Sequence, residues 1–253
     1  MHQTLRVLIA VSAAGLATGS GACSSSTSPS AQQMTLSFSS QSPVAAGSAS
    51  SRGPNFSITV ASGANTVVIT KAQIVARKFE LKSVSGGSCP ETDIRGDSCE
   101  EMKLGPMLVD LPLGAGTTTT TPLPISVPAG TYRELEMQIH RPVSNPLDVA
   151  FTLANPLFAG ISIRVEGTFN GTPFVFTSPL TAELELAFSP AITVAATGGN
   201  ITVQIDVASW FKTAAGAVID PATANAGGVN ENTVRETIKR SFHALDDSNR
   251  DGK

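Results

Sequence analysis

The chain has 253 residues and a formal net charge of −3, with 17 Lys and Arg against 20 Asp and Glu. Charged residues make up only 15% of the chain, against about 25% in an ordinary soluble domain. No basic run interleaved with aromatic residues is present, which argues against a nucleic-acid-binding protein. The composition is typical of an exported β protein rather than a cytosolic α/β enzyme.

The first 22 residues have the pattern of an export signal. Arg6 precedes the apolar stretch of residues 7–17, which is too short to span a bilayer. Small residues then lead to Cys23, so the segment resembles a bacterial lipoprotein signal, which implies lipid attachment at Cys23. Ser20 stands where that signal prefers Leu, and ordinary signal peptidase would cut the same bond. We expect an exported protein that is anchored to the membrane through a lipid on Cys23, in the periplasm, outer membrane or cell surface.

Residues 23–33 are rich in Ser and predict a flexible tether. From residue 34 onward, apolar residues recur with a period of two, which predicts β-strands. Asn170-Gly171 lies between two such runs and predicts a hairpin. We therefore expect a mainly β protein, an antiparallel β-sandwich over residues 34–224, as one unit or as two halves that meet near residues 142–148.

The most informative stretch is residues 123–142, LPISVPAGTYRELEMQIHRP. Pro128-Ala129-Gly130 predicts a turn. After it, Leu135, Met137 and Ile139 alternate with polar residues, which indicates a half-buried strand at the centre of the sandwich. Tyr132, at the entry to this strand, is expected to hydrogen-bond back to a nearby backbone group, as in Greek-key sandwiches.

Three segments together resemble a known family. ITKAQIVARKFEL, MLVDLPLG and LPISVPAGTYRELEMQIHRP are similar to a family of bacterial surface lipoproteins with a domain of unknown function. The resemblance covers roughly Asn55 to Arg141. It implies an immunoglobulin-like or transthyretin-like sandwich in the cell envelope and assigns no activity or functional residue.

Cys89 and Cys99 remain as a pair once Cys23 is set aside. They flank a short polar loop, and in an exported protein this arrangement predicts a disulfide. Several carboxylates make the same loop acidic, which suits either a hard cation such as Ca²⁺ or simple solvation.

The C-terminal part predicts one helix over residues 230–246, where Val234, Ile238, Phe242 and Leu245 fall at helical spacing. A polar tail, residues 247–253, follows. Within it, Asp247, Asn249 and Asp251 match the start of an EF-hand-type loop and are candidate ligands for weak Ca²⁺ binding. The acidic residue that completes such a loop is missing, so the alternative is a polar, frayed helix end.

No catalytic residue is predicted. His140 and His243 neighbour no marked nucleophile, and His140 is expected on the polar face of a strand. No nucleotide, metalloprotease or hydrolase motif is present, and no cofactor is expected beyond weak Ca²⁺. The sequence favours a non-catalytic envelope lipoprotein that binds a polysaccharide or protein partner. The alternatives are a structural or assembly component of the outer envelope and, less favoured, a secreted hydrolase.

Overall fold

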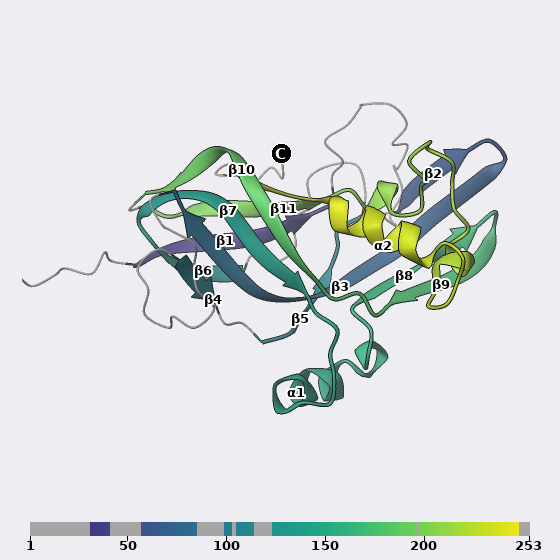
Figure 1. The fold of residues 1–253 in the computed structure, drawn as a ribbon, viewed down its shortest axis with the longest axis horizontal. Coiled ribbons are helices and arrows are strands. Elements are labelled where there is room, and N and C mark those ends of the chain that lie inside the picture. Colours follow the sequence, from purple (N-terminus) through teal and green to yellow (C-terminus); the bar gives the residue numbers. More distant parts are fainter. Residues whose placement is uncertain are drawn as a thin grey trace, which may run out of the picture.

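A computed structural model describes the chain over residues 31–40, 57–84, 99–102, 105–113, 123–195 and 197–247. It is mainly β, with two sheets that pack face to face as a sandwich (Figure 1). The predicted fold class is therefore confirmed. Strands that precede and follow residues 142–148 are mixed in both sheets, so the described residues form one sandwich rather than two halves.

The smaller sheet has the strand order β12-β11-β1-β6. These strands are β12 (Phe242–Asp246), β11 (Gly199–Ile205), β1 (Ala31–Ser39) and β6 (Leu123–Pro128). β1 and β11 are parallel, whereas the other two pairs are antiparallel. One face of β1 and β11 is apolar and fully buried, as period-two alternation requires.

The larger sheet follows the order β10-β7-β3-β8-β9. Its strands are β10 (Ala182–Val194), β7 (Gly130–Ile139), β3 (Asn65–Ser83), β8 (Ile163–Phe169) and β9 (Thr172–Ser178). The short strands β2 (Ile58–Ser62), β4 (Cys99–Met102) and β5 (Met107–Asp110) also pair with β3. β3 is therefore the central strand of the sheet, because it also pairs with β7 and β8. Its register shifts between Arg77 and Phe79, where Lys78 has a φ of 55°.

The turn at residues 128–130 carries the chain from one sheet to the other, because β6 belongs to the smaller sheet and β7 to the larger. The Tyr132 hydroxyl donates a 2.9 Å hydrogen bond to the carbonyl of Pro128, which confirms the predicted contact. β7 lies between β10 and β3, and Leu135, Met137 and Ile139 are fully buried, as the alternation predicts. The hairpin at Asn170-Gly171 is also present, with φ values of 49° and 82°.

The prediction of a single helix over residues 230–246 is wrong in two respects. α2 (Glu231–Arg240) ends early, and the chain continues as β12, an edge strand in which Phe242 and Ala244 are buried and His243 is exposed. Ser241 ends the helix, and its hydroxyl accepts a 2.8 Å hydrogen bond from Trp210 Nε1. A second helix, α1 (Pro146–Ala154), lies between β7 and β8 and is not predicted from the sequence.

Three short 3-10 helices complete the fold: η1 (Pro156–Phe158), η2 (Val207–Ser209) and η3 (Pro221–Ala224). Within the described residues, no helix is both long enough and apolar enough to cross a bilayer. α1 and η1 stand away from the sandwich in Figure 1, whereas α2 lies against its body. The segment that carries α1 and η1, residues 141–162, is called the α1 excursion below.

Candidate functional site

Few of the site residues predicted from the sequence lie among the residues that the structure describes. Cys23, Cys89, Asn249 and Asp251 lie outside the described residues, and of Cys99 only its backbone place in β4 is described. The lipid site, the disulfide and most of the calcium loop therefore stay predictions.

Asp247 is the one predicted calcium ligand that the structure describes, and its side chain is buried. One carboxylate oxygen accepts hydrogen bonds from Thr202 Oγ1 at 2.7 Å and from Asn200 Nδ2 at 3.4 Å. These contacts hold Asp247 against β11. Nowhere in the described part of the chain do three His, Cys, Asp or Glu side chains come close enough to hold a metal ion.

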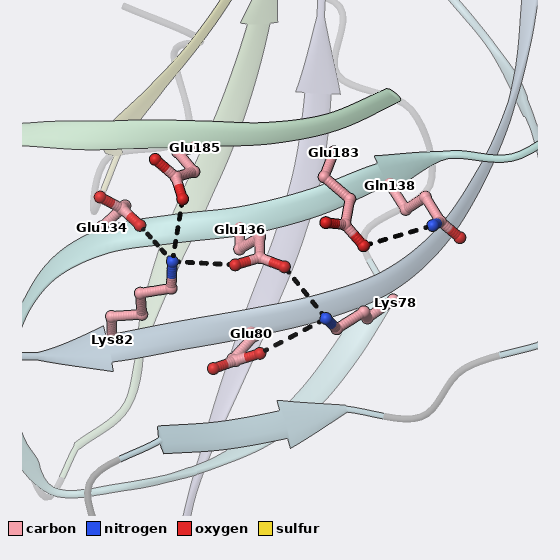
Figure 2. A network of polar contacts seen from close by, with 8 residues as sticks. All are labelled: Lys78, Glu80, Lys82, Glu134, Glu136, Gln138, Glu183 and Glu185. Atoms are coloured by element: carbon pink, nitrogen blue, oxygen red, sulfur yellow. Dashed lines mark hydrogen bonds and ion pairs between the residues drawn. The ribbon is translucent and has the colours of Figure 1, made fainter. Parts of the chain in front are cut away.

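Charged side chains form a network on the face of β3, β7 and β10 (Figure 2). Lys82 Nζ lies 2.8 Å from carboxylate oxygens of both Glu134 and Glu136. Lys78 Nζ lies 3.0 Å from the other oxygen of Glu136 and 3.8 Å from Glu80. The sequence places the β7 side chains of this set on a polar face, but not the cross-strand lysines that cover them.

Mutual pairing sets the charge states in this network. Burial alone would raise the pKa of Glu136, but hydrogen bonds from Lys82 and Lys78 outweigh it and hold that pKa below its usual value. Burial alone would likewise lower the pKa of Lys82, but hydrogen bonds to Glu134 and Glu136 outweigh it and raise that pKa. Both lysines are thus paired with Glu136, and these ion pairs link β3 to β7 across the sheet.

The α1 excursion begins and ends at one residue of β3. The amide of His140, at the end of β7, donates to the carbonyl of Val75 at 2.9 Å. The amide of Val75 donates to the carbonyl of Ser162, just before β8, at 2.7 Å. The side chains of Val75, Phe151 and Phe158 form a small apolar cluster that is separate from the main core. The excursion is thus fixed to β3 at its base by two hydrogen bonds and by packing.

A buried carboxylate organises the start of α1. Asp148 Oδ1 lies 2.9 Å from His140 Nε2, and Asp148 Oδ2 accepts from the Val143 amide at 2.9 Å and from Asn145 Nδ2 at 2.8 Å. Burial alone would raise the pKa of Asp148, but the hydrogen bonds from Val143 and His140 outweigh it and hold that pKa below its usual value. Asp148 is therefore an ionised carboxylate that hydrogen bonds fix in place at the start of α1.

Asn145 caps α1. Its side-chain oxygen accepts hydrogen bonds from the amides of Leu147 and Asp148, both at 2.9 Å. Pro146 follows at the first helical position, where its missing N–H costs nothing. The Asn-Pro pair followed by Asp148 is a helix-start pattern that the sequence does contain. This pattern is the signal that sequence reasoning missed.

A pocket of about 530 Å³ lies between the start of the excursion and α1. Val143, Val149 and Leu153 give it aliphatic walls, and Arg141 and Gly160 also line it. His140 and Asp148 do not line the pocket. Their contacts instead position the start of α1.

The solvent-facing side of the excursion is aliphatic. Leu147 is 72% exposed, Leu153 is 79% exposed and Leu157 is 63% exposed. Five of the eight large apolar residues that are exposed in the described ranges fall within residues 143–157. An apolar patch concentrated on one protruding element marks an interaction site. We therefore take the α1 excursion as the candidate functional site.

Comparisons with known proteins add no family to this description. No protein-family model and no curated protein matches the chain. One solved structure, MbnP from Methylosinus trichosporium, is similar over 85% of this chain and 99% of its own, with 13% sequence identity and a TM-score of 0.43. A likeness this weak carries no argument about fold or function.

Proposed function

We propose that the chain is an exported, lipid-anchored and non-catalytic binding protein of the bacterial cell envelope, and that the α1 excursion binds its partner. The signal pattern that ends at Cys23 supports export and anchoring. The resemblance to envelope lipoproteins over residues 55–141 agrees with that location. The observation that carries the binding function is the exposed aliphatic surface of the excursion, with its pocket.

The chemistry of this surface favours an apolar partner over a polysaccharide. Sugar-binding faces use exposed aromatic rings as platforms. In the described part of the chain, every large apolar residue that is exposed is Leu or Val. The aromatic residues of the excursion, Phe151 and Phe158, are buried against β3.

The proposal includes a disulfide between Cys89 and Cys99, which would close the acidic loop and stabilise the exported fold by about 2–3 kcal/mol. Alkylation of the non-reduced protein without modification of either Cys is the expected result. Two freely alkylated thiols would contradict the disulfide. The proposed binding requires no metal. Calorimetry with Ca²⁺ tests the separate hypothesis that Asp247, Asn249 and Asp251 bind this ion weakly. The buried contacts of Asp247 give that hypothesis no support.

Site-specific photo-crosslinking in intact cells tests the binding surface. A photoreactive amino acid replaces Leu153 on the excursion or, as the matched control, Val229, which is 90% exposed far from it in the sequence. We expect crosslinked products from position 153 and few from position 229. Equal yields from both positions would contradict a binding role for the excursion. Mass spectrometry of the mature N-terminus tests the anchor, and an unmodified Cys23 would contradict it.

A further inference from the structure

We propose that the α1 excursion docks on the interfacial region of a lipid bilayer, where its aliphatic side chains enter the headgroup and acyl boundary. The inference deepens the proposed function, on which it rests for the presence of the chain at a membrane surface. It identifies the apolar partner of the proposed function as lipid. Three features of the excursion carry it: the inverted polarity of α1, the internal hydrogen bonds of Asp148, Thr152 and Asn155, and the position of the one exposed charge.

The polarity of α1 is reversed relative to an ordinary surface helix. At about 100° per residue, Asp148, Phe151 and Thr152 fall on the side that faces the protein. The side that faces solvent is entirely apolar and consists of Pro146, Leu147, Val149, Ala150, Leu153 and Ala154. A surface helix normally places its charged residues on that side. The reversed pattern fits an apolar environment outside the protein.

Beyond Arg141, the excursion presents no charged side chain to that environment, and Ser144 is its one polar residue that is exposed. Asp148 is the only ionisable residue in residues 142–162, and it is fully buried and held by three donors. The hydroxyl of Thr152 donates to the carbonyl of Asp148, and the side chain of Asn155 donates to the carbonyl of Phe151 at 3.0 Å. Internal hydrogen bonds of this kind lower the cost of moving these polar groups into a less polar environment.

The one exposed charge lies at the base of this apolar tip. Arg141 immediately precedes it in the chain, is exposed, and lines the pocket beside Val143. Its guanidinium extends toward Gly160: a Cβ atom added to Gly160 would lie 4.0 Å from Arg141 Nη2. An arginine just outside an apolar segment pairs with lipid phosphate at headgroup level while the apolar residues lie deeper. The charge pattern of the excursion is therefore complementary to a phospholipid surface.

A second copy of the chain fits the surface less well. A stable protein interface buries about 800 Å² per partner from roughly 20–30 residues and has a polar rim. The excursion offers only a nine-residue helix and a three-residue 3-10 helix. A fluid bilayer boundary needs neither that area nor shape complementarity.

Vesicle flotation tests the inference. The full chain with Cys23→Ser, exported without lipid, is mixed with phosphatidylcholine vesicles with or without phosphatidylglycerol. The tip variant combines Leu147→Ser, Leu153→Ser and Leu157→Ser, and the matched control combines Val84→Ser, Val175→Ser and Val229→Ser, which are exposed elsewhere. We expect the Cys23→Ser chain to float with vesicles and the tip variant to lose roughly 100-fold in partitioning, because each leucine contributes on the order of fivefold. The control keeps its partitioning.

Arg141→Gln separates headgroup recognition from apolar insertion. We expect this variant to float with neutral vesicles but to lose about fivefold of the preference for vesicles with phosphatidylglycerol. A Cys23→Ser chain that does not float, or a control that loses as much as the tip variant, would overturn the inference. Protein crosslinks from position 153 without flotation would also overturn it, yet would leave the proposed function standing. An unmodified, unexported chain would instead defeat the proposed function.

Discussion

Replacement of Asp148 by Ala tests how the α1 excursion is held in place. The carboxylate accepts from Asn145 Nδ2 at 2.8 Å and from the Val143 amide at 2.9 Å, and His140 Nε2 lies 2.9 Å from it. Without it, these groups lose their partner at a site where Asp148 itself is fully buried. The variant should therefore destabilise the excursion more than the sandwich.

The size of the effect follows from the number of groups that lose a partner. Each buried donor left without an acceptor costs about 1–3 kcal/mol. Val143 and Asn145 lie near the surface, where water replaces part of the loss, so we expect a total of about 2–4 kcal/mol. Asp148→Asn keeps an acceptor oxygen but loses the charge, and it should cost roughly 1–2 kcal/mol.

Hydrogen–deuterium exchange and urea unfolding together measure this effect. Because Val75, Phe151 and Phe158 form a cluster separate from the main core, the amides of α1 should exchange faster while those of β7 keep their protection. Ser144→Ala, an exposed neighbour, serves as the control and should change neither measurement. A loss of less than about 0.5 kcal/mol in Asp148→Ala, or uniform acceleration over the whole sandwich, would refute the reasoning.

Three further predictions concern other contacts. Because the pKa of Asp148 in the folded protein is depressed, the carboxylate contributes to the free energy of unfolding above about pH 4, and this contribution is lost as pH falls through the folded pKa. The stabilities of the wild type and of Asp148→Asn, measured by urea unfolding, should therefore converge in acid. A constant difference between them would contradict this. Lys82→Met should cost roughly 1–3 kcal/mol at neutral pH, and the deficit should shrink on acidification as Glu136 is protonated; an unchanged unfolding midpoint would contradict the role of the network. Tyr132→Phe removes the bond to Pro128 and should cost about 1 kcal/mol, and a stability equal to that of the wild type would show that this bond is not stabilising.

The sequence predicts those parts of the fold in which local pattern and tertiary position agree. Alternation in β7 and the Asn170-Gly171 turn each have a local cause, and both are present in the structure. Tyr132 is likewise predictable because its partner, Pro128, is only four residues away. Contacts of this kind need no knowledge of which strands become neighbours.

The α1 excursion could not be found from periodicity. Helix detection depends on an apolar stripe that faces the core, whereas in α1 the leucines face solvent and Asp148 faces inward. His140 was expected on a polar strand face, but it is buried because α1 brings Asp148 to it. Only the Asn145-Pro146 helix start was available as a local signal.

β12 was missed for a different reason. Val234, Ile238, Phe242 and Leu245 satisfy helical spacing, but Leu245 is only half-buried. β11 offers an edge with which residues 242–246 pair, and this pairing overrides the helical pattern after Ser241. The pairing of Lys78 and Lys82 with Glu136 could not be predicted for a similar reason. Both lysines are on β3, and the sequence does not determine the register of β3 against β7.

Hydrogen–deuterium exchange of the lipidated protein in native membrane vesicles tests the central claim most directly. The comparison is with the Cys23→Ser chain in solution, and the region compared is α1, with β9 as the internal reference. The account predicts slower exchange across residues 146–154 at the membrane and equal exchange in β9, because the aliphatic side of α1 is then covered. Equal exchange of α1 in both forms would contradict the assignment of the α1 excursion as the binding surface.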